Sequence, residues 1–260
     1  MDVHKNPMLT TRHHQILKLL DQGGSQSLTA LAGALGVSGE TVRRDLGALQ
    51  DRGLIQRSHG RAALTGDGGE APFARRMREQ AAEKRALASA LAATIRDGDA
   101  VMMDTGTTTS LLARALGDHR RLTIVTNSSD IARALATRNG NRVYMAGGEL
   151  RPDSGAAFGR SAIDFVRPFA VTHAIVSAGA ADTGGIMDQA LEEAEFARTV
   201  LACGERRIVA TDATKFGRRG LVQVCGWAEV THLATDRSPS GPIAAALQAA
   251  SVALILPPAN

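Results

Sequence analysis

The 260-residue sequence has few aromatic residues, few cysteines and no long apolar run. Aromatic residues make up only 3 % of the chain, so its core must consist of Ala, Leu, Val and Ile. Cys203 and Cys225 lack the spacing of metal ligands and are interpreted as buried thiols in a reducing compartment. No stretch reaches the roughly 18 consecutive apolar residues of a membrane helix, and the first residues lack the apolar centre of a signal peptide. These absences predict a soluble, cytoplasmic protein without a membrane partner.

Positive charge is concentrated near the amino terminus. The formal net charge of the whole chain is +4 at pH 7. Residues 1–64 contain eight Lys and Arg against five Asp and Glu, whereas the other 196 residues contain 22 against 21. A cationic end on an otherwise neutral chain indicates a polyanionic partner at that end.

The first quarter of the chain has the pattern of three short helices followed by a small hairpin. Apolar residues recur at helical spacing, Ser27 and Ser38 precede two of the segments as N-caps, and glycines follow the segments. The expected elements are helices over residues 9–22, 28–35 and 39–51 and a hairpin over residues 54–64. This order predicts a winged helix-turn-helix domain.

Two adjacent arginines, Arg43 and Arg44, lie in the first turns of the third expected helix. In a helix-turn-helix the second helix enters the major groove, where arginine binds guanine through two hydrogen bonds. Neighbouring residues point about 100° apart, so one arginine faces the bases and the other contacts phosphate, while Asp45 can brace one of them. The residues expected to contact double-stranded DNA are Ser38, Glu40, Thr41, Arg43, Arg44, Arg57, His59 and Arg61. The alternative, a solvated helix face, is weakened by the basic hairpin that follows.

The remainder of the chain changes to alternating strands and helices. A linker composition over residues 65–72 is followed by a single expected helix over residues 73–99. The alternation after it predicts an α/β fold, with a mostly parallel sheet and ligand loops at the carboxyl ends of its strands. We therefore expect a DNA-binding domain over residues 1–64, a linker and connecting helix over residues 65–96, and an effector-binding domain over residues 97–260.

The stretch MMDTGTTTSLL places a glycine and three threonines where an expected strand turns into a helix. Backbone N–H groups at a helix N-terminus, together with hydroxyl groups, suit a phosphate. The alternative is that the threonines only cap the helix, although capping needs just one of them. No lysine follows as in a nucleotide-binding P-loop, so hydrolysis of nucleoside triphosphates is not expected.

Polar residues and glycines follow three other expected strands. Asn127 and Asp212 are equally typical of residues that hold turns, and Arg151 and Lys215 are equally typical of solvated side chains. At a shared sheet edge, however, the aspartates can accept hydrogen bonds from sugar hydroxyls and Lys215 can pair with a phosphate. The candidate effector-binding residues are Asp104, Gly106, Thr107, Thr108, Thr109, Asn127, Gly147, Gly148, Arg151, Asp212 and Lys215.

Several stretches resemble the DeoR family of bacterial transcription regulators. They are RHHQILKLLDQGG, LTALAGALGVSGETVRRDLGALQDRGLIQRSHG, DTGTTTSLLARAL, TIVTNSSDIARAL, MAGGELRP, EEAE and DATKFGR, and they extend from about residue 9 to 236. The resemblance implies a sensor domain similar in fold to ribose-5-phosphate isomerase, which binds a phosphorylated sugar or related metabolite. It also implies that the effector releases the protein from its operator. Residues that match family positions are Asp104, Gly106, Thr107 and Thr108 in the phosphate loop, and Asn127, Gly147, Gly148, Glu193 and Lys215 elsewhere.

The sequence departs from the family pattern at three places. Arg61 stands where the wing usually has a second glycine, which is compatible with a phosphate or minor-groove contact. Ala178 replaces an acidic residue that many members have, and Ala197 replaces a lysine. Isomerase chemistry needs a positioned base, so the loss at Ala178 makes it less favoured. The stretches AGGELR and AIDF are similar to the glycerol-3-phosphate repressor branch.

We therefore expect a repressor of sugar or polyol catabolism genes, acting as a homodimer or homotetramer because operators are often two-fold symmetric. The histidines are scattered, so neither a metal site nor a cofactor is expected. Two alternatives remain: a sugar-phosphate isomerase-like enzyme with an accessory domain, and an activator that needs its ligand in order to bind DNA.

Overall fold

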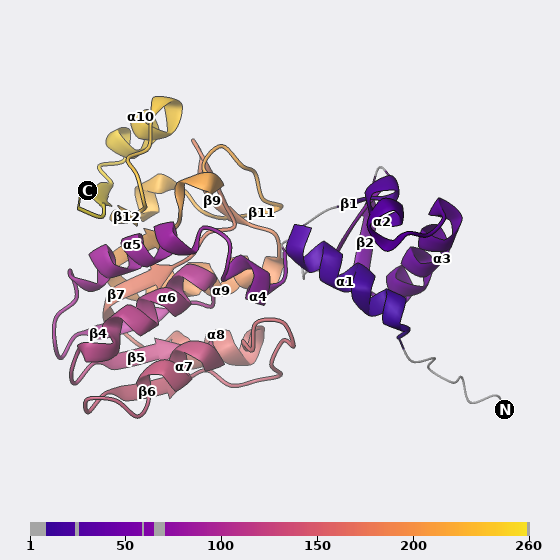
Figure 1. Cartoon of the computed structure of the whole chain (residues 1–260). Coiled ribbons are helices and arrows are strands. Elements are labelled where there is room, and N and C mark those ends of the chain that lie inside the picture. Colours follow the sequence, from indigo (N-terminus) through magenta and orange to yellow (C-terminus); the bar gives the residue numbers. More distant parts are fainter. Residues whose placement is uncertain (1–8, 24–25, 59, 65–70, 259–260) are drawn as a thin grey trace. The chain divides into compact units, whose positions relative to one another are not determined.

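The computed structural model describes residues 9–23, 26–58, 60–64 and 71–258 (Figure 1). The chain divides into two compact units, Met1–Arg75 and Arg76–Asn260, which we call the head and the body. In the described part of the chain, the head has one apolar cluster and the body has two. Within the described residues, no helix combines the length and the apolar character that a bilayer crossing requires.

The head consists of three helices and a small antiparallel sheet. Its elements are α1 (Thr11–Gly23), β1 (Gln26–Ser27), α2 (Leu28–Leu35), α3 (Gly39–Gln50), β2 (Ile55–Ser58) and β3 (Arg61–Leu64). The three helices and the hairpin are confirmed, and β1 adds a third strand beside β3. Val42, Leu46 and Leu49 recur at helical spacing on α3 and are buried together with Ile16 and Leu20 of α1.

Local signals set the boundaries of the head helices. The side chains of Ser27 and Ser38 accept hydrogen bonds from backbone N–H groups three residues further on, so both serines are the N-caps expected from the sequence. Gly36 ends α2 with a φ of 65°, a left-handed conformation that favours glycine.

The body is built around a seven-stranded parallel sheet in the order β13-β12-β10-β7-β4-β5-β6. The strands of the body are β4 (Ala100–Met103), β5 (Thr123–Thr126), β6 (Arg142–Met145), β7 (Val171–Val176), β8 (Ala180–Asp182), β9 (Gly185–Asp188), β10 (Gly204–Ala210), β11 (Val222–Cys225), β12 (His232–Ala234) and β13 (Ala253–Ile255). From β4 the chain builds one half of the sheet through β5 and β6, then returns to the other side of β4 through β7. The order therefore reverses between β4 and β7, and such a switch point is where open α/β sheets bind ligands.

Helices cover both faces of the large sheet. They are α5 (Ala81–Ala92), α6 (Thr107–Ala115), α7 (Ser129–Leu135), α8 (Arg160–Val166), α9 (Leu191–Ala202) and α10 (Gly241–Ala249). The short α4 (Phe73–Arg76) lies where the chain divides into the two units, and the 3-10 helices are η2 (Leu116–Asp118), η3 (Ala213–Lys215) and η4 (Trp227–Glu229). Figure 1 shows α5, α6 and α7 together on one face. Val101 and Met103 of β4 pack in the cluster formed by these helices, whereas Met102 packs in the opposite cluster with α8 and α9. The predicted α/β class is confirmed.

Two features of the body differ from the sequence-based expectation. The single helix expected over residues 73–99 is wrong, because the chain forms α4 and α5 and breaks between them at Gln80, which has a φ of 51°. A second sheet, in the order β11-β9-β8, was not expected at all, since its strands are short and belong to no strand-helix alternation.

Candidate functional site

The two arginines of α3 point away from the core of the head. The buried side of α3 carries Val42, Asp45, Leu46 and Leu49. At about 100° per residue, Arg44 points about 150° from the centre of this stripe and Arg43 about 110°. Arg43 donates to Glu40 one turn earlier, and both of these side chains are largely exposed. Arg44 therefore projects most directly outward from α3.

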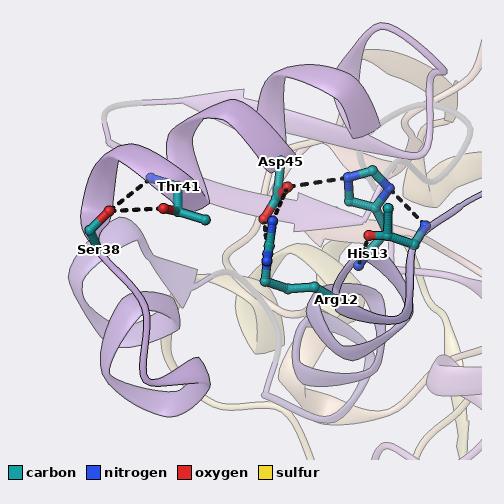
Figure 2. Close-up of polar contacts among 6 residues, drawn as sticks. Arg12, His13, Ser38, Thr41 and Asp45 are labelled. Atoms are coloured by element: carbon teal, nitrogen blue, oxygen red, sulfur yellow. Dashed lines mark hydrogen bonds and ion pairs between the residues drawn. The ribbon is translucent and has the colours of Figure 1, made fainter.

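Asp45 does not brace either of these arginines, as the sequence had suggested. Figure 2 shows its carboxylate turned toward α1, where Arg12 donates to both oxygens and His13 Nε2 lies 3.4 Å from Oδ1. The Arg12 hydrogen bond and charge hold the pKa of Asp45 below its ordinary value, although burial works against this. Asp45 thus forms a buried contact between α1 and α3 that fixes the position of α3.

The remaining residues of the candidate DNA surface flank the same helix. The Ser38 hydroxyl accepts from the Thr41 backbone at 3.2 Å and lies 2.9 Å from the Thr41 hydroxyl (Figure 2). These contacts make Ser38 a cap as well as an exposed residue. Arg57 on β2 and Arg61 on β3 are exposed. His59 lies outside the described residues.

In the body, four of the residues singled out in the sequence, together with Ser177, follow neighbouring parallel strands. β10, β7, β4, β5 and β6 lie side by side in this order, and their carboxyl ends lead to Asp212, Ser177, Asp104, Asn127 and Gly147. Adjacent strands are about 4.8 Å apart, so these five positions share one edge of the sheet. Asp104 accepts hydrogen bonds from the Ser177 backbone N–H at 3.0 and 3.1 Å and from its hydroxyl at 3.3 Å. This contact joins β4 and β7 at the switch point.

The turn from β4 into α6 has the properties of an anion site. Gly106 is the N-cap of α6 and provides no side-chain cap, so the first N–H groups of the helix remain available. Thr107 and Thr108 are 5 % exposed, and no hydrogen bond of either hydroxyl is found among the described residues. Thr109 differs, because its hydroxyl donates to the carbonyl oxygens of Asp104 and Gly106. Two of the three threonine hydroxyls are therefore not engaged by the described part of the protein.

Asp104 lies beside this turn, and the charge of its carboxyl group changes with pH near neutrality. Burial raises the pKa of Asp104 to about 7, despite the hydrogen bonds from Ser177. Glu193 lies close enough to add to the increase. Well below pH 7 the carboxyl group is therefore mostly neutral and can donate a hydrogen bond to a ligand oxygen, whereas at its pKa it is ionised about half of the time.

Replacing Asp104 with asparagine is expected to remove a pH dependence of stability. The pKa of this carboxyl group is about 3.9 in the unfolded chain and about 7 in the folded chain. A raised pKa contributes stability that is complete below the unfolded value and is lost as pH rises through the folded value. The wild-type free energy of unfolding should thus fall relative to Asp104→Asn by up to about 4 kcal/mol over that interval. Denaturant titrations at pH 4.5 and pH 8 measure this change, and an equal difference at both pH values contradicts it.

Asn127 and Asp212 hold turns, one of the two roles considered for them. The Asn127 side chain accepts from the Thr105 hydroxyl at 2.9 Å and donates to the Ala157 carbonyl at 2.8 Å. Asp212 caps η3 by accepting from the Thr214 backbone and hydroxyl. Both residues therefore shape the edge of the sheet.

The loop after β6 is fastened to the start of α9. Arg151 donates to Glu193 at 2.7 Å and to Glu192 at 2.6 Å, and its guanidinium lies over the Phe158 ring. Arg151 is thus paired rather than solvated. Gly148 has a φ of 148°, and a Cβ there would lie 3.3 Å from the Ser161 hydroxyl. Gly147 is exposed, with open space beside its Cα.

Two residues of this edge were missed from the sequence. Ser177 was passed over in favour of its neighbour Ala178, although it directly follows a buried strand. Lys84 lies on α5 and is buried, and its pKa is lowered chiefly by burial; Asp212 raises and Lys215 lowers it. A lysine within an otherwise apolar helical stripe is the signal that could have revealed it.

Known families match both parts of the chain. The family described as DeoR-like helix-turn-helix domain matches residues 12–66. The family described as DeoR C terminal sensor domain matches residues 79–237. The first match contains α3, and the second contains the whole candidate edge of the body.

Curated relatives align along nearly the full chain. The HTH-type transcriptional repressor CsqR of Escherichia coli is 35 % identical over 247 residues, which is 95 % of each chain. The glycerol-3-phosphate regulon repressor of Escherichia coli is 33 % identical over 231 residues, which is 88 % of this chain and 92 % of the relative.

Solved structures align more weakly. Ribose 5 phosphate isomerase A of Neisseria gonorrhoeae shares 16 % identity and a TM-score of 0.38 over 52 % of this chain and 53 % of the isomerase. A likeness this weak says nothing about activity, and the α/β architecture of the body follows from its own strand order.

Proposed function

Because the chain belongs to the DeoR family of transcription regulators, we propose that it is a DNA-binding repressor released from its operator by a phosphorylated sugar or polyol. The head binds the operator, with Arg44 contacting base edges in the major groove and Arg43 contacting a backbone phosphate. The body binds the effector at the carboxyl edge of its sheet. The effector acts by binding one of two conformations more tightly than the other.

The observation that carries the effector proposal is the uncapped start of α6 at the switch point. It combines uncapped backbone N–H groups, two threonine hydroxyls for which no partner is found in the described part of the chain, and a carboxyl group whose pKa is raised to about 7. A phosphate can accept hydrogen bonds from the N–H groups and the threonine hydroxyls, and a sugar hydroxyl can form a hydrogen bond with the carboxyl group of Asp104. Lys215, at the end of η3 on the same edge, supplies a positive charge.

A panel of small phosphates tests the proposal directly. Operator fragments are selected from genomic DNA with the immobilised full-length protein. Ribose 5-phosphate, glucose 6-phosphate, glycerol 3-phosphate and inorganic phosphate are then compared by thermal shift and by anisotropy of labelled operator DNA. We expect at least one organic phosphate to raise the melting temperature and to weaken operator binding. A phosphate that strengthens operator binding indicates the activator alternative.

We propose that the body has no isomerase activity. Ala178 leaves one family acidic position without a carboxyl group that could act as the base. Incubating the full chain with ribose 5-phosphate and assaying for ribulose 5-phosphate checks this, and sustained turnover contradicts it.

We also propose that the protein is a dimer or tetramer, because an operator with two-fold symmetry binds two copies of the head. Light scattering of the full chain measures the mass of the assembly.

A further inference from the structure

Lys84 is a buried cation in a position that suits an apolar side chain. It is the first member of the buried stripe of α5, which continues with Leu87, Ala88 and Leu91. Only 5 % of the residue is exposed. Burying an ammonium group is costly, and methionine would fill the same space without that cost. A lysine here therefore indicates a role beyond packing.

The ammonium group of Lys84 is only partly satisfied by the protein. Its Nζ donates to the carbonyl oxygen of Arg76 at 2.7 Å. An ammonium group has three N–H donors, and in the described part of the chain this carbonyl is the only acceptor that Lys84 reaches. Arg76 ends α4 and is the first residue of the body after the division of the chain. Lys84 thus holds the segment through which the head is connected.

The same ammonium group belongs to the candidate effector edge. The chain passes along α5, which is about 18 Å long, before it enters β4 at the amino edge of the sheet, so the first turn of α5 lies toward the carboxyl edge. Asp212 and Lys215 lie close enough to shift the pKa of Lys84 in opposite directions, and burial lowers it further. Lys84 therefore contacts Arg76 and lies within electrostatic range of Asp212, which follows β10, and of Lys215 in η3.

We infer that Lys84 couples the effector site to the head, by donating to an anionic oxygen of the effector while it holds the Arg76 carbonyl. The inference rests on the proposed function, because it requires an anionic effector at this edge. A group that contacts both partners transmits a change at one to the other, so occupation of the edge alters the segment around Arg76. Lys84 acts as a positioning residue for that segment.

Lys84→Met tests this coupling in the full-length chain, with Arg85→Met as the matched control. Arg85 is the next residue of α5 and is exposed, so its replacement removes the same charge outside the site. The probe is the phosphate with the largest thermal shift in the panel above. Trypsin cleavage after Arg75 and Arg76 reports on the connecting segment, with and without the probe, and needs no operator DNA.

In the wild type and in Arg85→Met, saturating probe should change the cleavage rate at these sites at least about fivefold. In Lys84→Met the change should fall below about twofold, and probe binding should weaken about tenfold or more. Should Lys84→Met not fold, Lys84→Gln takes its place with the same expectation. A Lys84 variant that keeps the full probe-dependent change overturns the coupling and leaves the proposed function intact. A wild-type chain that binds none of the panel overturns both.

Discussion

The Arg44→Ala variant is expected to bind the operator about 10- to 100-fold more weakly than the wild type. Arg44 projects from α3 opposite the buried stripe, and the Asp45 tie to Arg12 and His13 fixes the direction of that helix. An arginine held in this way can donate two hydrogen bonds to one guanine. Another base pair at the same position does not offer both acceptors, so the arginine discriminates against it. Anisotropy titrations with the selected operator and with single-base variants measure the affinity and the loss of discrimination at one base pair.

Arg43→Ala provides the comparison that assigns the two roles. Arg43 lies further round the helix and donates to Glu40, a geometry that suits a phosphate contact. Its loss should weaken all sequences alike and reduce the slope of log affinity against log salt by about 0.9. Arg133→Ala removes an exposed arginine from α7 of the body and should change neither property. If Arg43 shows the base preference and Arg44 the salt effect, the two assignments are reversed; if neither matters, α3 is not the recognition helix.

Local patterns in the sequence predicted the head well because its elements are defined locally. The serine caps, the glycine after α2 and the spacing of Val42, Leu46 and Leu49 are each decided within one helix. Asp45 was misinterpreted because its partners, Arg12 and His13, lie more than thirty residues earlier in the sequence. Its place within an apolar stripe nevertheless indicated burial, and a buried carboxylate requires a partner.

In the body, the sequence located the strand ends but not the contacts between them. Which ends are neighbours depends on strand order, and the pairing of β4 with β7 is what brings Asp104 to Ser177. The break between α4 and α5 was also hidden, because Gln80 adopts a left-handed conformation that no glycine or proline marks. The burial of Lys84 could have been predicted, because it is the one charged residue on the buried stripe of α5. Its role could not, because that depends on Arg76 and Asp212.

The Gly106→Ala variant is expected to lose effector binding by about 100-fold or more while its head remains folded. A Cβ on Gly106 would lie 2.0 Å from the Ser177 hydroxyl oxygen and 2.6 Å from the Ser177 Cβ, so one of the two strands must shift. Such a shift moves the N–H groups that open α6, and misplacing an anion site by about 1 Å is enough to cost this much. Isothermal titration with the active phosphate measures the affinity, and operator binding should no longer respond to it. Gly117→Ala is the control, since a Cβ there meets nothing closer than 3.9 Å.

A second substitution shows whether that collision is the cause. Ser177→Gly removes both side-chain atoms that the new Cβ meets first, yet keeps the backbone N–H that donates to Asp104. The Gly106→Ala/Ser177→Gly double variant should therefore recover most of the affinity lost by Gly106→Ala, leaving only the tight 3.2 Å approach to the Thr109 hydroxyl. If the affinity losses of the two single variants simply add in the double variant, contact with Ser177 is not the cause of the loss in Gly106→Ala. Full effector binding by Gly106→Ala alone would place the effector somewhere other than the start of α6.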